Sequence, residues 1–276
     1  MFVIIIFFSF LFGLCLGSFL NVCIFRLPRE LSVVAGRSLC PHCEKQIKWY
    51  DNLPLLSYLL LSGECRYCGE PIRLRYFIVE LASGLIVAMS AFVWLQLPRP
   101  DYINFILSVV FVLISMAMAA IDLEFSIIPN ELNYTLILLG LVSGLFTRYP
   151  LTTAAGGQFQ PEQLWQVLGG FFLGGGIFLL LALISPLIYG KAALGMGDVK
   201  LIAAYGAWLG PAGVLLTIIS GSLIGAIVGT VLMKLKGQSL RTEIPFGPFL
   251  CLAGVIAYIY GTEIIQWYLA LMSRGV

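Results

Sequence analysis

Long uncharged apolar runs constrain this chain more than any other feature of its sequence. Residues 2–25 carry no charged side chain, and residues 201–233 carry none over 33 residues. A run of about 20 apolar residues is long enough to cross a bilayer as a helix. Only 11% of the 276 residues are charged, against about a quarter in an ordinary soluble domain. The chain is therefore predicted to be an all-α polytopic membrane protein.

The number of spans follows from where these runs are interrupted. The apolar runs cover residues 2–25, 77–97, 102–121, 132–147, 164–189, 201–233 and 248–272. The sixth is too long for one ordinary span, and Gly210-Pro211 within it is a turn signal. Dividing this run at the turn, with its first half beginning near Asp198, predicts about eight transmembrane helices.

The distribution of basic residues predicts the orientation, because Lys and Arg concentrate in cytoplasmic loops. With eight spans and the N-terminus outside, the inside segments are 26–76, 122–131, 190–200 and 234–247. They hold thirteen of the sixteen Lys and Arg residues, and an undivided sixth run would lower this to eleven. The first run has no Lys or Arg before it, which predicts an uncleaved anchor rather than a signal peptide.

Four of the seven cysteines lie in the polar segment 26–76, as two CxxC pairs separated by 21 residues. The pairs are Cys40 with Cys43 and Cys65 with Cys68. This spacing is close to that of four-thiolate zinc sites, and disulfides are disfavoured in the reducing cytoplasm. We expect a structural zinc ion that folds a cytoplasmic loop between the first and second spans. The alternatives are two disulfides or a redox dithiol.

Two aspartates border apolar runs. Asp122 follows residues 113–121, and Asp198 lies within Gly195-Met-Gly-Asp-Val-Lys200. Ionisable groups at the edge of hydrocarbon are functional candidates by default. The predicted topology places both on the cytoplasmic face, where two neighbouring carboxylates would share one proton. The ionised member can take a proton from an attacking water while the protonated member donates to an amide carbonyl.

Several neighbours of these aspartates are candidate supporting residues. Gly195 and Gly197 would let a substrate backbone approach Asp198, since neither has a Cβ atom. Glu80 lies near the start of the second span, and we expect it to support the structure by pairing with Lys200 or Arg75 rather than to act in chemistry. A helix-capping or ion-pairing role is the simpler interpretation of either aspartate alone.

Residue types that are rare in the chain argue against other classes of function. His42 is the only histidine, so a Ser-His-Asp mechanism has no base outside the cysteine cluster, where His42 is an alternative ligand. The chain has no run of like charges, and so nothing in its charge pattern indicates a nucleic-acid partner. An ion or small-molecule transporter and a non-catalytic assembly factor stay open. The transporter predicts carboxylates at mid-span depth, and the assembly factor predicts that changing either aspartate is silent.

Several motifs stand in a characteristic order along the chain. Gly17-Ser-Phe-Leu-Asn-Val22 precedes the two CxxC pairs and Asn52-Leu-Pro-Leu55, and then come Ile121-Asp-Leu-Glu-Phe-Ser-Ile-Ile-Pro129, Gly195–Lys200 and Ile244-Pro-Phe-Gly-Pro248. Together they resemble the motifs of the type IV prepilin peptidases, which are membrane aspartic proteases of the GxGD kind. Phe77 stands where that family often has proline, and Asn130 where aspartate is common.

The resemblance implies a bifunctional enzyme of the bacterial inner membrane. Such enzymes cut the basic leader from type IV prepilins and type II secretion pseudopilins at the cytoplasmic face. They then methylate the new N-terminal amine with S-adenosylmethionine, an activity that accompanies the large cysteine-containing loop. A peptidase without methyltransferase activity is the alternative. The expected organisation is a first transmembrane helix (1–25), a zinc loop (26–76) and a transmembrane peptidase core (77–276).

Overall fold

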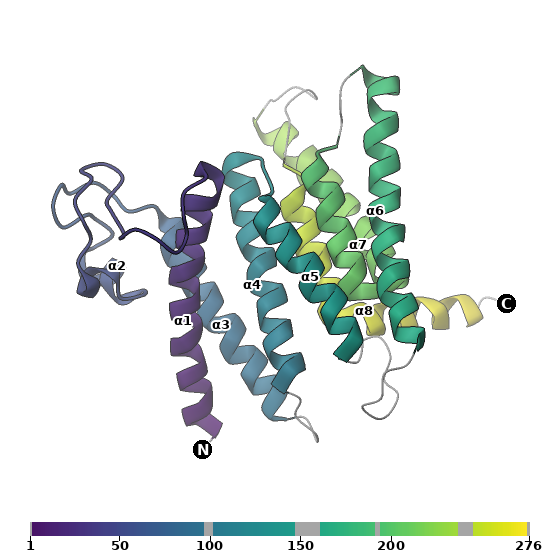
Figure 1. The fold of residues 1–276 in the computed structure, drawn as a ribbon, viewed down its shortest axis with the longest axis horizontal. Coiled ribbons are helices and arrows are strands. Elements are labelled where there is room, and N and C mark those ends of the chain that lie inside the picture. The colour runs from purple at the N-terminus through teal and green to yellow at the C-terminus, as the bar shows by residue number, and fades with distance from the viewer. Residues whose placement is uncertain (1, 97–101, 147–160, 191–193, 237–244, 275–276) are drawn as a thin grey trace. The chain divides into compact units, whose positions relative to one another are not determined.

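The computed structural model describes residues 2–96, 102–146, 161–190, 194–236 and 245–274 (Figure 1). Its regular elements are helices: α1 (Phe2–Arg26), η1 (Leu27–Arg29), η2 (Trp49–Asn52), α2 (Leu56–Leu60), α3 (Leu74–Leu95), α4 (Tyr102–Phe125), α5 (Asn130–Phe146), α6 (Pro161–Tyr189), α7 (Met196–Lys236) and α8 (Gly247–Arg274). Parts of the predictions lie outside the described residues, namely the span ends Leu97 and Thr147 and the charges at Arg99, Arg148, Lys191 and Arg241. The chain divides into two compact units, Met1–Leu113 and Ile114–Val276.

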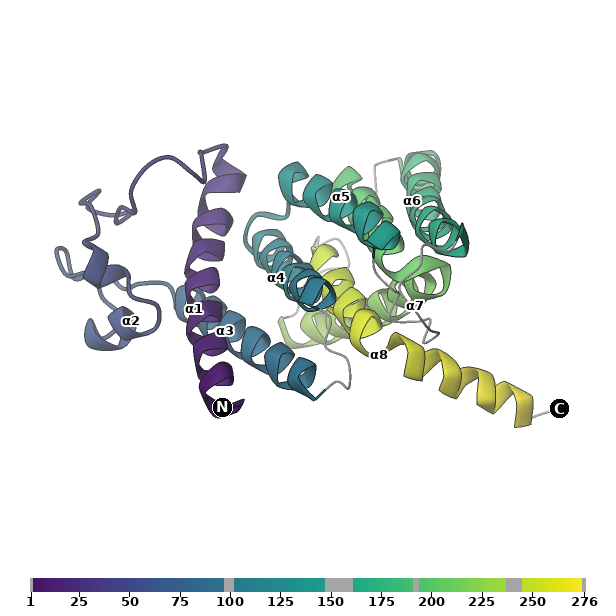
Figure 2. The same ribbon diagram turned by 60° about the horizontal axis from the view of Figure 1, so that its bottom comes forward.

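Among the described residues, α1 and α3 are the two long helices that lie wholly in the first unit, and they lie side by side in both ribbon views (Figures 1 and 2). Glycines let their backbones approach closely. A Cβ atom at Gly17 would lie 2.7 Å from the Glu80 Cα, and one at Gly13 would lie 2.8 Å from the Gly84 Cα. Helix α3 thus belongs to the same compact unit as α1, whereas the predicted peptidase core begins at residue 77, within α3.

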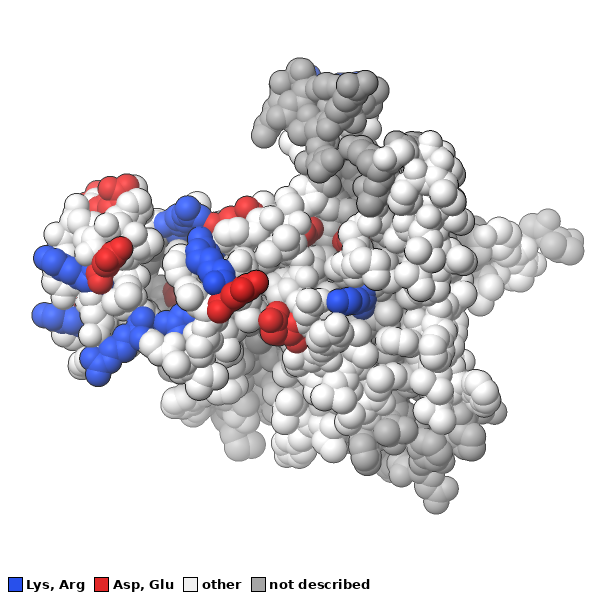
Figure 3. All heavy atoms as spheres, turned by 45° about the horizontal axis from the view of Figure 1, so that its top comes forward, with Lys and Arg blue, Asp and Glu red and all other residues white. Residues whose placement is uncertain are grey.

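The segment between α1 and α3 is an irregular loop organised around the two cysteine pairs. One isolated antiparallel bridge, Leu39 with Gln46, flanks the first pair, and another, Glu64 with Pro71, flanks the second. Arg66 donates from Nε and Nη2 to both carboxylate oxygens of Asp51, at 2.6–3.0 Å, and so ties η2 to the second pair. On the face drawn in Figure 3, charged side chains gather mainly over this loop.

Helix α7 of the second unit is two helical segments joined at a kink. Gly210 has φ 68° and ψ −178°, which is not helical, and Pro211 follows it. Glycine adopts this backbone conformation without the steric penalty that a Cβ atom brings. The first segment, residues 196–210, is about 22 Å long at 1.5 Å per residue. It is thus shorter than the hydrocarbon core of about 30 Å.

The kink lets the chain return to the face from which α7 starts. Asn133 near the start of α5 donates to the Gly197 carbonyl at the start of α7. Gly247 at the start of α8 donates to Asp122 at the end of α4. The two starts belong to one face, because the Ile128 side chain lies against both Gly197 and Gly247. Between the start of α7 and the start of α8 the chain must therefore leave this face and return to it, as the predicted division at Gly210 requires.

Small residues bring α7 close to its neighbours α6 and α8. A Cβ atom at Gly170 of α6 would collide with the Gly206 carbonyl of α7, and the reverse substitution would collide as well. Later in α7, Gly221 and Gly225 lie against Leu250 and Phe249 of α8. The small-xxx-small patterns at 170–174 and 221–225 are thus places where helices pack closely.

Each predicted span can be compared with a described helix. Six of them, α1, α3, α4, α6, α7 and α8, are long and apolar enough to cross a membrane. Helix α5 has 17 residues and matches the remaining predicted run. The count of eight spans, which adds α5 and takes the two segments of α7 separately, stays a prediction. The prediction of an all-α polytopic membrane protein is confirmed.

The contact between Gly170 and Gly206 makes a stability prediction. Gly170→Ala should lower the free energy of unfolding by about 1–3 kcal/mol, because an added methyl group pushes α6 from α7. The matched control is Gly176→Ala on the same helix, where a Cβ atom would have nothing within 4 Å. Alanine should be neutral or slightly stabilising there. Thermal unfolding in detergent, followed by circular dichroism, compares the two, and equal midpoints would contradict the packing described.

Candidate functional site

Asp122 lies in the last turn of α4 and is buried, with 5% of the residue exposed. Its Oδ2 atom accepts a hydrogen bond of 3.0 Å from the backbone N–H of Gly247, the first residue of α8. A Cβ atom at Gly247 would lie 2.6 Å from the same oxygen, so only glycine fits against the carboxylate. A backbone donor at a helix N-terminus is a favourable partner for a carboxylate.

Asp198 lies in the first turn of α7, so the same favourable placement applies to it. Its backbone N–H donates to the Gly195 carbonyl at 3.1 Å, and its Oδ2 lies 3.3 Å from where a Cβ atom of Gly195 would be. Asp198 is close enough to Asp122 for the two charges to interact. The structure therefore brings the two predicted aspartates together within the second unit.

The Ile128 side chain lies between the two segments that carry or contact the aspartates. The position of a Gly197 Cβ atom is 3.1 Å from the Ile128 Cβ, and that of a Gly247 Cβ atom is 3.0 Å from the Ile128 Cδ1. One apolar side chain thus touches the glycine before Asp198 and the glycine bonded to Asp122. The ends of α4, α5, α7 and α8 meet at this point.

Residues at the start of α5 hold the start of α7 in place. The Lys200 Nζ donates to Asn130 Oδ1 at 2.6 Å and to the Tyr134 hydroxyl at 3.2 Å. It also lies 5.1 Å from the centre of the Tyr134 ring, within cation–π range. Asn133 is fully buried, and its Nδ2 donates to the Gly197 carbonyl at 3.3 Å. Lys200 thus anchors the Asp198 segment through α5.

A buried polar layer adjoins the aspartates. The Tyr205 hydroxyl donates to Ser115 Oγ at 2.9 Å, which links α7 to α4. Cys251 of α8 is hydrogen-bonded to Tyr205 and lies within electrostatic range of both Asp122 and Asp198. Buried polar groups that satisfy one another fix the relative rotation of the helices carrying them.

Glu80 belongs to the first unit, where its Oε2 accepts a hydrogen bond of 2.8 Å from the backbone N–H of Leu55. It also accepts one from the Ser18 side chain of α1. Leu55 has a positive φ of 58°, a strained backbone for leucine. The Glu80 carboxylate therefore holds the loop against α3 through Leu55, and α1 against α3 through Ser18. Lys200, one of the two partners expected for it, donates instead to Asn130 and Tyr134.

The four cysteines of the two CxxC pairs form one cluster. Their Sγ atoms all lie within 4.8 Å of one another, and those of Cys40 and Cys68 are 3.9 Å apart. Four thiolates around a tetrahedral ion at about 2.3 Å would be about 3.8 Å apart. The cluster thus fits a single metal ion. Hydrogen bonds from the backbone of Tyr67 and Cys68 lower the pKa of the Cys65 thiol to about 7. At Cys68 a backbone hydrogen bond from Glu70 is outweighed by desolvation and the neighbouring thiols, which raise the pKa of that thiol to about 12. The thiols therefore lose their protons in steps, with Cys65 the first of these two to become the thiolate that binds metal.

His42 lies beside this cluster. Its Nδ1 atom is 3.9 Å from Glu70 Oε1, and both side chains are about half exposed. The metal-sized cluster consists of the four cysteines alone among the described residues.

Sequence reasoning did not assign roles to Gly247, Asn133 or Ile128. Gly247 was noticed only within the motif Ile244–Pro248, and Ile128 looks like any apolar residue. Asn133 carried a weak signal, because it is a polar residue at the second position of the apolar run 132–147. Each role depends on which helix ends meet, and hydropathy along one chain does not report that.

Helices able to cross a membrane, two neighbouring aspartates where helix ends meet and a four-cysteine cluster able to hold a metal define a polytopic membrane protein with a carboxylate site. Residues 109–230 match the type IV leader peptidase family, and residues 11–94 match the bacterial peptidase A24 N-terminal domain. The chain belongs to the type IV leader peptidase family.

Curated relatives support this assignment over nearly the whole chain. A prepilin leader peptidase/N-methyltransferase of Legionella pneumophila is 34% identical, over 94% of this chain and 92% of the relative. Proteins with the same name from Pseudomonas aeruginosa and Xanthomonas campestris are 34% and 33% identical, over 94% and 93% of this chain and 91% and 92% of theirs. No solved structure matches the chain.

The cysteine cluster makes a prediction about metal content. Purified protein loaded with cobalt should show the intense visible bands of a tetrahedral thiolate site, at one ion per chain. Cys68→Ser should lose the ion or shift these bands. His42→Ala is the matched control and should keep the spectrum, because only the cysteines supply ligands. Loss of the bands in His42→Ala with retention in Cys68→Ser would contradict the four-cysteine site.

Proposed function

We propose that this protein cleaves the leader peptides of type IV prepilins and type II secretion pseudopilins and then N-methylates the mature N-terminus. The pairing of Asp122 with Asp198 at the meeting of helix ends carries the peptidase half of the proposal. The methyltransferase half rests on the names of the relatives, which combine both activities.

The carboxylate pair would act as an aspartic protease. A pair that shares one proton presents an ionised and a protonated member. The ionised carboxylate takes a proton from water as the water oxygen bonds to the scissile carbonyl carbon. The protonated carboxylate donates to the carbonyl oxygen. The carbon–nitrogen bond then breaks, and the departing amine takes up a proton.

The glycines around the pair would leave room for the substrate backbone. Gly195 is exposed and Gly197 half-buried beside Asp198, and neither presents a side chain to an approaching peptide. Lys200 would keep this segment in register through Asn130 and Tyr134. We assign Gly195, Gly197 and Lys200 to positioning rather than to proton transfer.

The four-cysteine cluster would hold zinc in a structural role. Four protein thiolates complete a tetrahedron and leave no position for a reacting water. The ion would stabilise a loop whose described residues are mostly exposed. The cytoplasm keeps the cysteines reduced, which suits this assignment.

Methylation would follow cleavage on the new N-terminal amine, with S-adenosylmethionine as the donor. The unprotonated amine forms a nitrogen–carbon bond as the methyl carbon–sulfur bond breaks. The bonding electron pair stays on sulfur, and one proton leaves the nitrogen. The donor is water-soluble, so its site belongs to the polar part of the chain.

The substrate and the orientation fit each other. An apolar pilin helix would lie in the bilayer of the bacterial inner membrane while its basic leader stays in the cytoplasm. Most Lys and Arg residues of this chain lie in the segments predicted to be inside. With the N-terminus outside, the cut falls at the cytoplasmic interface, where α4 ends and α7 and α8 begin.

The transporter and assembly-factor alternatives are less well supported. A transporter needs ionisable groups near the bilayer midplane. Asp122 and Asp198 instead occupy the last turn of α4 and the first turn of α7. An assembly factor does not need the close fit of Gly247 against the Asp122 carboxylate.

Cleavage of a membrane-embedded prepilin by purified protein tests the proposal. Asp122→Asn and Asp198→Asn should each lower the cleavage rate by about 100-fold or more, because neither can supply the shared acid and base. Both variants should keep their bound metal and melting temperature, which separates lost chemistry from lost fold. Mass spectrometry of the product with S-adenosylmethionine present reports the added methyl group. A wild-type cleavage rate in either variant would contradict the aspartic-protease mechanism.

The contact between Gly247 and Asp122 makes a second prediction. Gly247→Ala should lower kcat by about tenfold to 100-fold, because its methyl group displaces the carboxylate by a fraction of an ångström. Gly176→Ala serves as the control, since a Cβ atom there has nothing within 4 Å. Steady-state cleavage assays measure kcat for the two variants and so test this prediction. A Gly247→Ala enzyme as fast as the control would show that Asp122 tolerates movement.

A further inference from the structure

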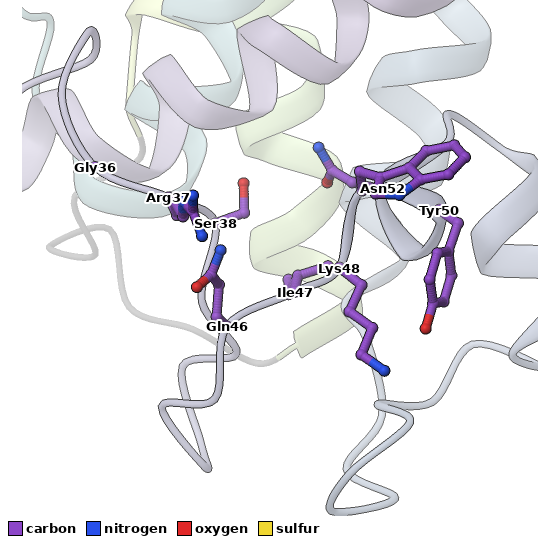
Figure 4. Close-up of a pocket in the computed structure, with 9 residues that line it drawn as sticks. Gly36, Arg37, Ser38, Gln46, Ile47, Lys48, Tyr50 and Asn52 are labelled. Carbon is purple, nitrogen blue, oxygen red and sulfur yellow. The ribbon is translucent and has the colours of Figure 1, made fainter.

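The loop between α1 and α3 contains a cavity of about 690 Å³, lined by residues 36–38, 46–50 and 52. This volume lies within the range of about 300–1,000 Å³ typical of small-molecule sites. Figure 4 shows the lining side chains on two stretches of the loop that face each other. The lining lies outside the candidate membrane spans, so a water-soluble molecule can reach it.

Aromatic side chains line one wall of this cavity. Trp49 is 79% exposed and Tyr50 is 40% exposed, and their rings meet edge to face with centroids 5.7 Å apart. A tryptophan this exposed contributes little to the packing of its own loop. A flat aromatic face can stack on a purine base, and it attracts a cation placed over it.

Cationic and polar groups complete the lining. Arg37 and Lys48 are the two charged residues of the lining, and both are cations. Lys48 also lies near the Tyr50 ring, 5.5 Å from its centre, and in Figure 4 the two side chains extend in the same direction. A guanidinium is suited to hold a carboxylate by two parallel hydrogen bonds. Ser38, Gln46 and Asn52 offer the hydrogen-bonding groups that sugar hydroxyls and base edges use.

We infer that this cavity is the binding site of the methyl donor, an adenosyl sulfonium that carries an amino-acid carboxylate. The inference rests on the proposed function, because a methyl donor is needed only if the protein is a methyltransferase. The aromatic wall takes the adenine ring or the sulfonium, and Arg37 or Lys48 takes the carboxylate. The polar residues take the ribose.

Both walls of the cavity are tied to the cysteine cluster. Residues 36–38 and 46–50 are joined to each other by the Leu39–Gln46 bridge beside Cys40 and by a hydrogen bond of 2.9 Å from the Ile47 N–H to the Ser38 carbonyl. Residues 49–52 form η2, whose Asp51 is paired with Arg66, the residue that follows Cys65. One ion bound to all four thiolates would therefore hold the bridge and η2 in place together. Removing the ion should open the cavity.

From the other side, Arg26 fixes the wall that carries Arg37. Its guanidinium donates to four backbone carbonyls, those of Ser32, Ala35, Gly36 and Arg37, at 2.6–3.2 Å. The turn that carries Arg37 is thus held before any ligand arrives. A preformed site avoids the loss of conformational entropy that ordering a loop on binding would bring.

Calorimetric titration of the full chain in lipid nanodiscs tests the inference, with S-adenosylmethionine and S-adenosylhomocysteine as probes. Trp49→Ala and Arg37→Ala should each weaken the dissociation constant by about tenfold or more. The matched control is Trp165→Ala, which removes a 74% exposed tryptophan from α6 and should bind as wild type does. Cobalt spectra of each variant show whether its loop is folded.

Metal removal is the second arm of the same experiment. Stripping the ion with a chelator should abolish binding of both probes, and adding zinc back should restore it. Wild-type affinity in both Trp49→Ala and Arg37→Ala would overturn the inference and assign these residues to the bilayer surface or to solvent. Full binding by metal-free protein would overturn it too. No prepilin is present, so failed cleavage leaves this result standing, and failed binding leaves the peptidase proposal standing.

Discussion

The hydrogen bond from the Gly247 backbone to the Asp122 carboxylate is the contact on which the second unit depends. A carboxylate at the edge of hydrocarbon needs a polar partner, and here the partner is the first N–H of another helix. For α8 to begin beside Asp122, the chain must return to the face from which α7 starts. The left-handed Gly210 makes that return. A kink that lies three turns after Asp198 and far along the chain from Asp122 therefore determines whether the pair can form.

In both units, helices pack closely where small residues meet. Gly170 against Gly206 joins α6 to α7, and Gly13 and Gly17 against α3 join the two helices of the first unit. In a bilayer, apolar side chains gain little by leaving lipid, so helices associate where their backbones approach closely. Polar contacts then set rotation, as with Tyr205 and Ser115, or Lys200 with Asn130. The aspartates are held by packing in two directions and by hydrogen bonds at the helix ends.

The loop of the first unit follows a different physical rule. Its residues are mostly exposed, and it has no buried apolar core of its own among the described residues. The four thiolates and the bidentate pair of Asp51 with Arg66 connect its turns instead. A metal ion held by these thiolates would stabilise the loop as helix packing stabilises the spans. This explains how a short polar segment can keep a cavity open between two stretches of irregular chain.

The sequence by itself determined the helical membrane fold, the division at Gly210-Pro211, the four-cysteine cluster and the two aspartates. Each of these is a property of composition or of short-range spacing, such as a 33-residue uncharged run or two CxxC pairs. Only the tertiary structure decided that Gly247 bonds to Asp122, that Ile128 lies against Gly197 and that Asn133 holds the same segment. It also decided that α3 packs with α1, and that residues 36–38 face residues 46–50. These contacts join residues far apart in the chain. Hydropathy reports how much of a helix is apolar and not which of its faces meets which neighbour.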